Sequence, residues 1–184
     1  MSAATDLSRE ALELLTERPA LVGRLCGFER LTDELHGQWL RQMLHSREDV
    51  TLLAHRGSFK TTCLTLAIAI LTVTEPTGNI LFLRKTDEDV CEVLRQVKGL
   101  LLSEAMQCLT RELWGHPVGL TRATAYELTT DCYRSPRGAV QLLGQGIGGS
   151  LTGKHADIIF TDDIVNLQDR LSPAERERTR AIYR

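Results

Sequence analysis

The sequence has few of the features that mark membrane, secreted or zinc-binding proteins. Its longest apolar run, residues 63–73, is interrupted by Thr65 and Thr72 and is too short to cross a bilayer. The N-terminus has no basic segment, so it does not read as a signal peptide. The five cysteines are widely scattered, with no CxxC and no neighbouring Cys/His pair. A reducing cytosol fits this pattern, whereas structural zinc does not.

The charge balance excludes a globally basic nucleic-acid-binding protein. The 184 residues carry a net charge of −2, so contact with DNA would have to come from a local patch. An apolar content of 42% with so small a net charge also excludes disorder. The length is that of one domain with a sizeable core.

The apolar pattern predicts an α/β fold. Helical spacing and short apolar runs alternate along the chain, which is typical of a parallel sheet covered on both faces. Residues 144–153, with five glycines, are expected to form a loop, and residues 105–115 are ambiguous. The expected helices are 7–15, 33–45, 63–73, 86–101 and one beginning at 172, and the expected strands are 50–54, 79–83, 118–130, 139–143 and a buried 157–163.

Residues 55–62 have the layout of a phosphate-binding loop between the strand 50–54 and an apolar helix. Gly57 permits a tight turn, Lys60 can neutralise phosphates, and the Thr61 hydroxyl can hold Mg²⁺. The match to the standard motif is imperfect, because Ala54 and Phe59 stand where glycines are usual. An ordinary surface turn followed by a helix-start lysine explains the loop alone equally well.

Two carboxylates, Asp162 and Asp163, end the last apolar strand. In phosphate-loop NTPases a second strand ends beside the loop, with one carboxylate for Mg²⁺ and a neighbour that polarises water. A solvated pair that caps the next helix is the alternative. With a phosphate loop about 100 residues upstream in a βα pattern, the functional interpretation is favoured.

Both motifs resemble those of the large terminase subunits of tailed phages, the motors that pump DNA into capsids. The loop matches that family's deviant Walker A sequence at every position except Phe59, and residues 151–163 are similar to its Walker B region. The resemblance covers residues 28–184. It implies a P-loop NTPase-type three-layer sandwich with a mainly parallel sheet. The matching loop residues are Arg56, Gly57, Ser58, Lys60 and Thr61.

The resemblance also implies roles for single residues. Thr61 and Asp162 would position Mg²⁺, Asp163 would activate water where many relatives carry Glu, and Arg56 would sense the γ-phosphate. Lys60 would contact the transferred phosphate, together with the loop amides. The residues expected to bind ATP are Arg56, Gly57, Ser58, Phe59, Lys60, Thr61, Thr62 and His36.

Residues 28–40 resemble the adenine-side motif of the same family, in which Gln precedes Trp by three residues. Here His36 takes that place before Trp39, and the nearby Gln38 is the other candidate for an adenine contact. Simple packing of His36 and Trp39 in a helix explains the segment at least as well. Arg84 and Lys85 follow a strand and are expected to be solvated there, with DNA or phosphate contact as the less favoured alternative.

The resemblance sets the expected organisation of the chain. Residues 1–46 would be an N-terminal helical segment with the adenine-side motif, and residues 47–184 a truncated ATPase core without the family's nuclease domain. The sheet would lack the strand that follows the Walker B strand, which in this class lies between the Walker A and Walker B strands. We therefore expect an N-terminal fragment that binds ATP and hydrolyses it slowly alone.

The implied function is ATP hydrolysis that drives double-stranded DNA into procapsids. The implied partners are that DNA, the portal protein, the small terminase subunit and further copies in a homo-oligomeric ring, with no membrane. The implied location is the host bacterial cytoplasm and, transiently, the procapsid portal. Two alternatives remain: a helicase-like nucleic-acid-dependent ATPase, and a non-catalytic terminase remnant that binds only nucleotide or a partner.

Overall fold

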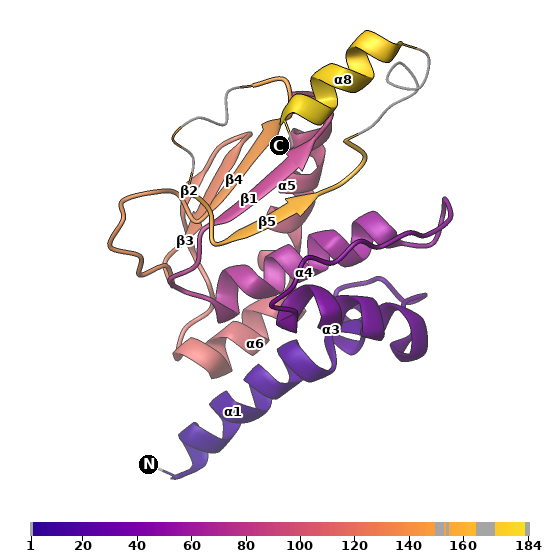
Figure 1. Ribbon diagram of the computed structural model, residues 1–184. Helices are drawn as coiled ribbons and strands as arrows, with labels where there is room; N and C mark the ends of the chain where they lie inside the picture. The colour runs from indigo at the N-terminus through magenta and orange to yellow at the C-terminus, as the bar shows by residue number, and fades with distance from the viewer. Residues whose placement is uncertain (1, 150–152, 154, 165–171, 183–184) are drawn as a thin grey trace.

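The N-terminal part of the protein contains helices and no strand among its described residues. The computed structural model describes residues 2–149, 153, 155–164 and 172–182. Its first helices pack below the sheet in Figure 1, and they share one hydrophobic cluster with the long central helix. The elements of this part are α1 (Ser2–Glu17), α2 (Pro19–Leu25), the π-helical turn η1 (Asp33–Gly37), α3 (Gln38–His45) and α4 (Lys60–Thr74).

The remainder alternates between strands and helices and forms a sheet with the order β2-β3-β4-β1-β5. β1 pairs in parallel with both β4 and β5, whereas β3 pairs antiparallel with both β2 and β4. The α/β prediction is therefore confirmed, but the sheet is mixed and not mainly parallel. These elements are β1 (Ile80–Arg84), α5 (Asp87–Leu101), α6 (Glu104–Trp114), β2 (Leu120–Ala123), β3 (Glu127–Thr130), β4 (Leu142–Gly146), β5 (Ile158–Thr161) and α8 (Pro173–Ile182).

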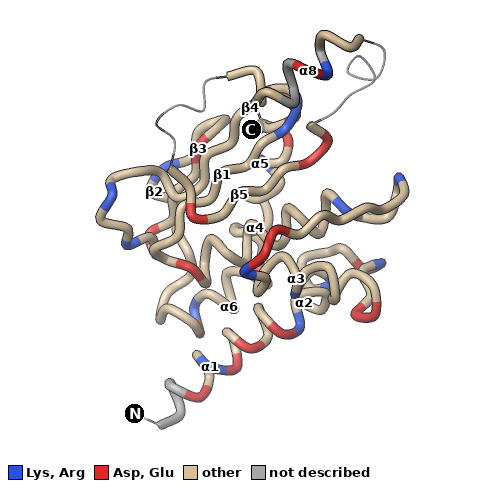
Figure 2. Tube along the Cα trace, viewed as in Figure 1, with Lys and Arg blue, Asp and Glu red and all other residues tan. Residues whose placement is uncertain are grey.

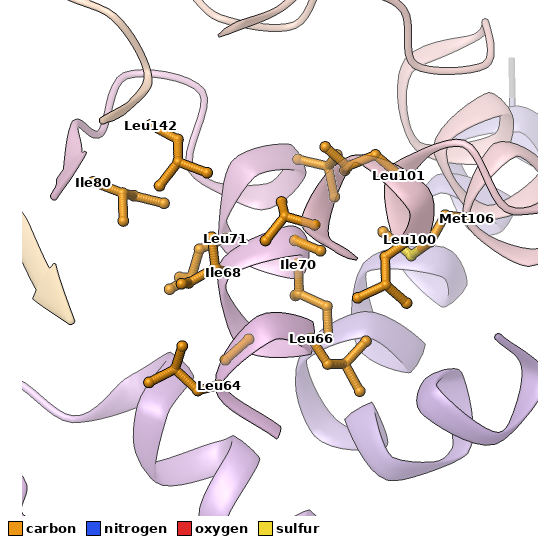
Figure 3. Packing of buried hydrophobic residues seen from close by; sticks show 14 of the residues in the cluster. Leu64, Leu66, Ile68, Ile70, Leu71, Ile80, Leu100, Leu101, Met106 and Leu142 are labelled. Carbon is orange, nitrogen blue, oxygen red and sulfur yellow. The ribbon is translucent and has the colours of Figure 1, made fainter. Parts of the chain in front are cut away.

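The core lies between α4 and one face of the sheet. α4 is apolar all round and buries every side chain from Cys63 to Val73, as expected for a helix inside a protein. Figure 3 shows Ile68 and Leu71 of α4 pointing toward Ile80 and Leu142 of the sheet. Among the described residues, the opposite sheet face carries a small second cluster around Leu81, Leu83 and Ile147.

The strand predicted at residues 50–54 is absent. This segment has no regular secondary structure, and its side chains Leu53 and Val50 are 90% and 48% exposed. A β-branched apolar segment forms a strand only when it can pair and pack against a sheet. Within the described residues no strand pairs with the outer edge of β5, and residues 50–54 remain outside the sheet.

The first two glycines of the predicted loop 144–153 instead belong to a strand, whereas residues 148–149 lie in a turn and 150–152 lie outside the described residues. β4 runs through Gly144 to Gly146. A Cβ on Gly144 would lie 2.4 Å from Val90 Cγ1 and 2.7 Å from Leu94 Cδ1 of α5. The glycines therefore allow α5 to pack directly onto β4, which a side chain would prevent.

The strand at residues 157–163 is present, but it is not buried. β5 covers Ile158–Thr161 at the edge of the sheet, and Ile159 is 59% exposed. Among the described helices, none is long and apolar enough to pass through a membrane.

Candidate functional site

A cavity of about 940 Å³ opens at the carboxyl ends of β1 and β5, beside the start of α4. In Figure 1 the three parallel strands point the same way, toward the end of α4 at which that helix begins. This is the edge at which open α/β sheets bind ligands. The cavity is lined by residues 54–62, Arg84, Lys85, Thr86, Asp89 and Asp163.

The loop before α4 is turned by residues with left-handed backbone conformations. Gly57 has φ 84° and Phe59 has φ 59°, and the Ser58 hydroxyl donates to the carbonyl of His55 at 2.7 Å. α4 then begins at Lys60 with no acidic residue in its first turn. The free N–H groups and positive dipole end of a 15-residue helix thus border the cavity, an arrangement that favours an anion.

Four charged side chains from three parts of the chain meet at this edge. Lys60 Nζ lies 3.1 Å from Asp162 Oδ1 and 3.2 Å from Asp163 Oδ1. Arg84 Nη2 lies 3.2 Å from Asp162 Oδ2 and 3.6 Å from Asp163 Oδ2. Asp162 is buried and Asp163 is largely exposed. The structure thus brings together Lys60 and the two aspartates.

The pKa of Lys60 is raised by this environment. Burial by itself lowers that pKa, but the hydrogen bonds and negative charges of Asp162 and Asp163 outweigh the effect of burial. Lys60 therefore stays charged throughout the physiological pH range. A cation that also contacts two carboxylates can exchange those contacts for phosphate oxygens.

Thr61 and Asp162 present two oxygen atoms in an arrangement that fits Mg²⁺. The Thr61 hydroxyl donates to Asp162 Oδ2 at 2.9 Å. Two adjacent ligands of an octahedral Mg²⁺ with bonds of 2.0–2.1 Å are separated by about 2.9 Å. The hydroxyl and carboxylate oxygens could therefore occupy one edge of such a coordination shell.

Backbone strain is concentrated in the same place. Among the described residues other than glycine, only Phe59 and Asp163 have positive φ, 59° and 46°. Each such residue costs of order 1–3 kcal/mol and persists only where its surroundings enforce the conformation. Strain of this kind clusters at functional sites, and here both residues belong to the two predicted motifs.

His36 packs against the loop and contacts its backbone at Ser58. Its Nδ1 accepts a hydrogen bond from the backbone N–H of Thr32 at 3.0 Å, so its Nε2 is free to donate to the carbonyl of Ser58 at 3.3 Å. The ring is buried and contacts Trp39 and Phe59 edge to face. His36 is not among the residues that line the cavity, and the structure places it under the loop.

The remaining predicted residues lie around the loop. Arg56 is exposed on the cavity wall, and Thr62 lies in the first turn of α4. Gln38 is exposed and does not line the cavity. ATP contacts of Arg56 and Thr62, and an adenine contact of His36 or Gln38, stay predictions.

The predicted solvent exposure of Arg84 is wrong. The residue was expected to be solvated, but its side chain is only 13% exposed and contacts both aspartates. A signal for this was present: Arg84 ends a strand that was expected to be parallel to the one preceding Asp162. Carboxyl ends of parallel neighbours meet at one edge of a sheet.

The candidate site thus combines a cationic loop and a helix N-terminus with two carboxylates, of which Asp163 lines the cavity and Asp162 is buried behind it. These are the components that phosphate-loop NTPases use to bind a nucleotide and a magnesium ion. Comparisons of the chain with protein-family models, curated proteins and solved structures found no match.

Proposed function

We propose that this protein binds MgATP at the cavity beside α4 and hydrolyses it. The observation that carries the proposal is the contact of Lys60 and Thr61 with Asp162. Their positions differ by about 100 residues in sequence, and an ordinary surface turn gives no reason for them to meet. Each motif supplies the context that the other requires.

The residues divide the chemistry between them. Lys60, the loop amides and the start of α4 would hold the phosphates, with Arg56 reaching the γ-phosphate from the cavity wall. Thr61 and Asp162 would hold Mg²⁺, which when bound neutralises the charge that develops on the transferred phosphoryl group. Asp163, 66% exposed and next to the cavity, would orient and deprotonate the attacking water.

The biological setting follows from the resemblance to large terminase subunits. On that basis the protein is a phage or prophage ATPase that contributes to packaging double-stranded DNA. Its partners would be the DNA, the portal protein, the small terminase subunit and further copies in a ring. It would act in the host bacterial cytoplasm and transiently at the procapsid portal. Figure 2 shows acidic and basic positions interspersed along the trace, so in this view a DNA contact would be local.

A second candidate is a protein that binds nucleotide without turnover. The observation that favours it is Phe59, whose left-handed backbone stands where glycine is usual. Phosphate release by the purified chain distinguishes the two candidates, with and without double-stranded DNA. If Asp163 activates water, Asp163→Asn reduces the rate at least 100-fold, as expected for loss of a general base.

The matched control for this assay is Asp49→Asn, the same chemical change at an exposed residue outside the cavity. It should leave the rate unchanged. Hydrolysis that is equally fast in the wild type and Asp163→Asn would contradict the proposed role of Asp163. ATP binding without measurable release would select the second candidate.

A further inference from the structure

Three side chains with metal-binding chemistry meet near the amino ends of the parallel strands, opposite the cavity. They are His116, Asp131 and Cys132, and their ligand atoms all lie within 4.8 Å of one another. None of these residues lines the nucleotide cavity. The cysteine spacing argued against structural zinc, because His116 and Cys132 are separated in sequence by the hairpin β2–β3 and meet only in the fold.

The fold holds the three residues together through two local structures. α6 ends at Gly115, whose φ of 79° and hydrogen bond to the carbonyl of Arg111 cap the helix and deliver His116 to the surface. Asp131 and Cys132 directly follow β3. Because β3 runs antiparallel to β4, it ends at the amino ends of β4 and β1. Asp162 lies past the opposite, carboxyl end of the parallel strands.

The spacing of the ligand atoms suits a tetrahedral ion. His116 Nδ1 lies 3.6 Å from Asp131 Oδ2, and Cys132 Sγ lies 3.5 Å from Asp131 Oδ1. Bonds of about 2.0 Å to nitrogen or oxygen and 2.3 Å to sulfur at tetrahedral angles separate ligand atoms by about 3.3–3.6 Å. The two measured distances run to different oxygens of Asp131, and the Cys132 sulfur and the imidazole nitrogen, which lie within 4.8 Å of one another, would have to approach by at most about 1.3 Å.

The carboxylate of Asp131 is already oriented by the backbone. The N–H of Gly119 donates to Asp131 Oδ1 at 3.0 Å. A Cβ on Gly119 would lie 2.8 Å from Asp131 Oδ2, so the close approach depends on the glycine. Outer hydrogen bonds of this kind fix the ligands of metal sites. The side chains of His116 and Asp131 are 45% and 35% exposed, whereas Cys132 is buried beneath them.

We propose that His116, Asp131 and Cys132 bind one Zn²⁺ ion, with water as the fourth ligand. The combination of thiolate, imidazole and carboxylate suits Zn²⁺, whereas Mg²⁺ and Ca²⁺ require oxygen ligands. Zinc would replace the proton that the Cys132 thiol donates to Asp131 Oδ1. It would also take the place of the contact between His116 Nδ1 and the carbonyl oxygen of Pro117 at 3.1 Å. The ion would then join the end of α6 to the end of β3.

Titration of the reduced 184-residue chain with Co²⁺ tests this proposal, because cobalt reports thiolate ligation through a charge-transfer band. One equivalent of Co²⁺ should produce the band together with the visible spectrum of a tetrahedral ion, and Zn²⁺ should displace it. Cys132→Ser should abolish the band. A thiolate band cannot arise from the carboxylates of the nucleotide site, so the outcome is independent of ATP binding.

Two further variants separate a built site from a general effect of folding. His116→Gln, at a half-exposed position, should keep the fold by circular dichroism and weaken Co²⁺ binding at least tenfold. His45→Gln is the matched control, since His45 has the same side-chain exposure of 45% and a carboxylate neighbour, Glu17, at 3.3 Å. It should change nothing. Absence of the band in the wild type, its survival in Cys132→Ser, or unchanged affinity in His116→Gln would overturn the proposal.

Discussion

Replacing Arg84 with Met should destabilise the protein through the buried carboxylate that Arg84 contacts. Asp162 has a side chain only 2% exposed and three partners: Arg84 at 3.2 Å, Lys60 at 3.1 Å and Thr61 at 2.9 Å. Met fills a similar volume without charge. The variant therefore removes one of two cations from a carboxylate that solvent cannot reach.

The magnitude follows from how many partners Asp162 keeps. Leaving a buried charge with no partner costs about 3–5 kcal/mol, but here Lys60 and Thr61 remain. A single hydrogen bond to a charged group is worth about 1.5–3 kcal/mol. Arg84 also has a buried Nε with no hydrogen-bond partner in the described part of the chain. Removing this unpaired group is favourable and offsets part of the lost hydrogen-bond energy. We expect a loss of about 2 kcal/mol.

Urea unfolding measures this change. With a slope of about 2 kcal/mol/M, a loss of about 2 kcal/mol lowers the midpoint by about 1 M. In an Asp162→Asn background the effect of Arg84→Met should fall by at least half, because the buried charge is gone. Arg95→Met, at an exposed position of α5, is the control and should stay within about 0.5 kcal/mol of the wild type. An Arg84→Met variant as stable as the wild type would refute the reasoning.

Three further predictions concern the fold. Gly144→Ala should destabilise the protein by about 1–3 kcal/mol, because the added methyl group overpacks β4 against α5. Gly99→Ala, at a position of α5 with open space around it, should stabilise the protein by about 0.5–1 kcal/mol. Urea unfolding should show the two midpoints shifted in opposite directions. The hydrogen bond from the Asn79 N–H lowers the pKa of Asp157. The ionised Asp157 carboxylate therefore stabilises the fold fully above the unfolded pKa of about 3.9, and this stabilisation is lost as pH falls through the lower folded pKa. Asp157→Asn should therefore cost up to about 1 kcal/mol at pH 7, for a side chain 39% exposed, and the difference from wild type should disappear in acid unfolding experiments. Burial raises the pKa of Cys63 to about 12, and its thiol should not react with a thiol reagent at pH 8 until urea unfolds the chain.

Most helices were predictable from local signals. The Thr86 side chain accepts a hydrogen bond from the N–H of Asp89 and so caps α5 where the helix 86–101 was expected to begin. The apolar run at 63–73 lies within α4 as expected. Such signals act over a few residues and are visible in the sequence itself.

The sheet was harder to predict because strand formation depends on distant partners. Residues 50–54 have strand-like composition but no described partner, and they remain exposed. Gly144 and Gly146 suggested a loop, whereas contact with α5 makes glycine the residue that β4 requires. The direction of β3 and the edge position of β5 are likewise set by pairing and not by local pattern.

The candidate site was predictable where two motifs supported one another. Lys60, Thr61, Asp162 and Asp163 were named from the sequence, and they meet in the structure. The place of Arg84 depends on which strands are neighbours, and so does the meeting of His116 with Cys132. Neither arrangement is encoded by spacing along the chain.

Titration calorimetry of the 184-residue chain with MgATP tests the central claim most directly. The wild type should bind one nucleotide, and Lys60→Ala should abolish measurable binding because the main phosphate counter-charge is lost. Lys98→Ala, at an exposed position on α5 outside the cavity, should bind as the wild type does. Equal affinity for MgATP in the wild type and a folded Lys60→Ala variant would contradict the assignment of this cavity as a nucleotide site.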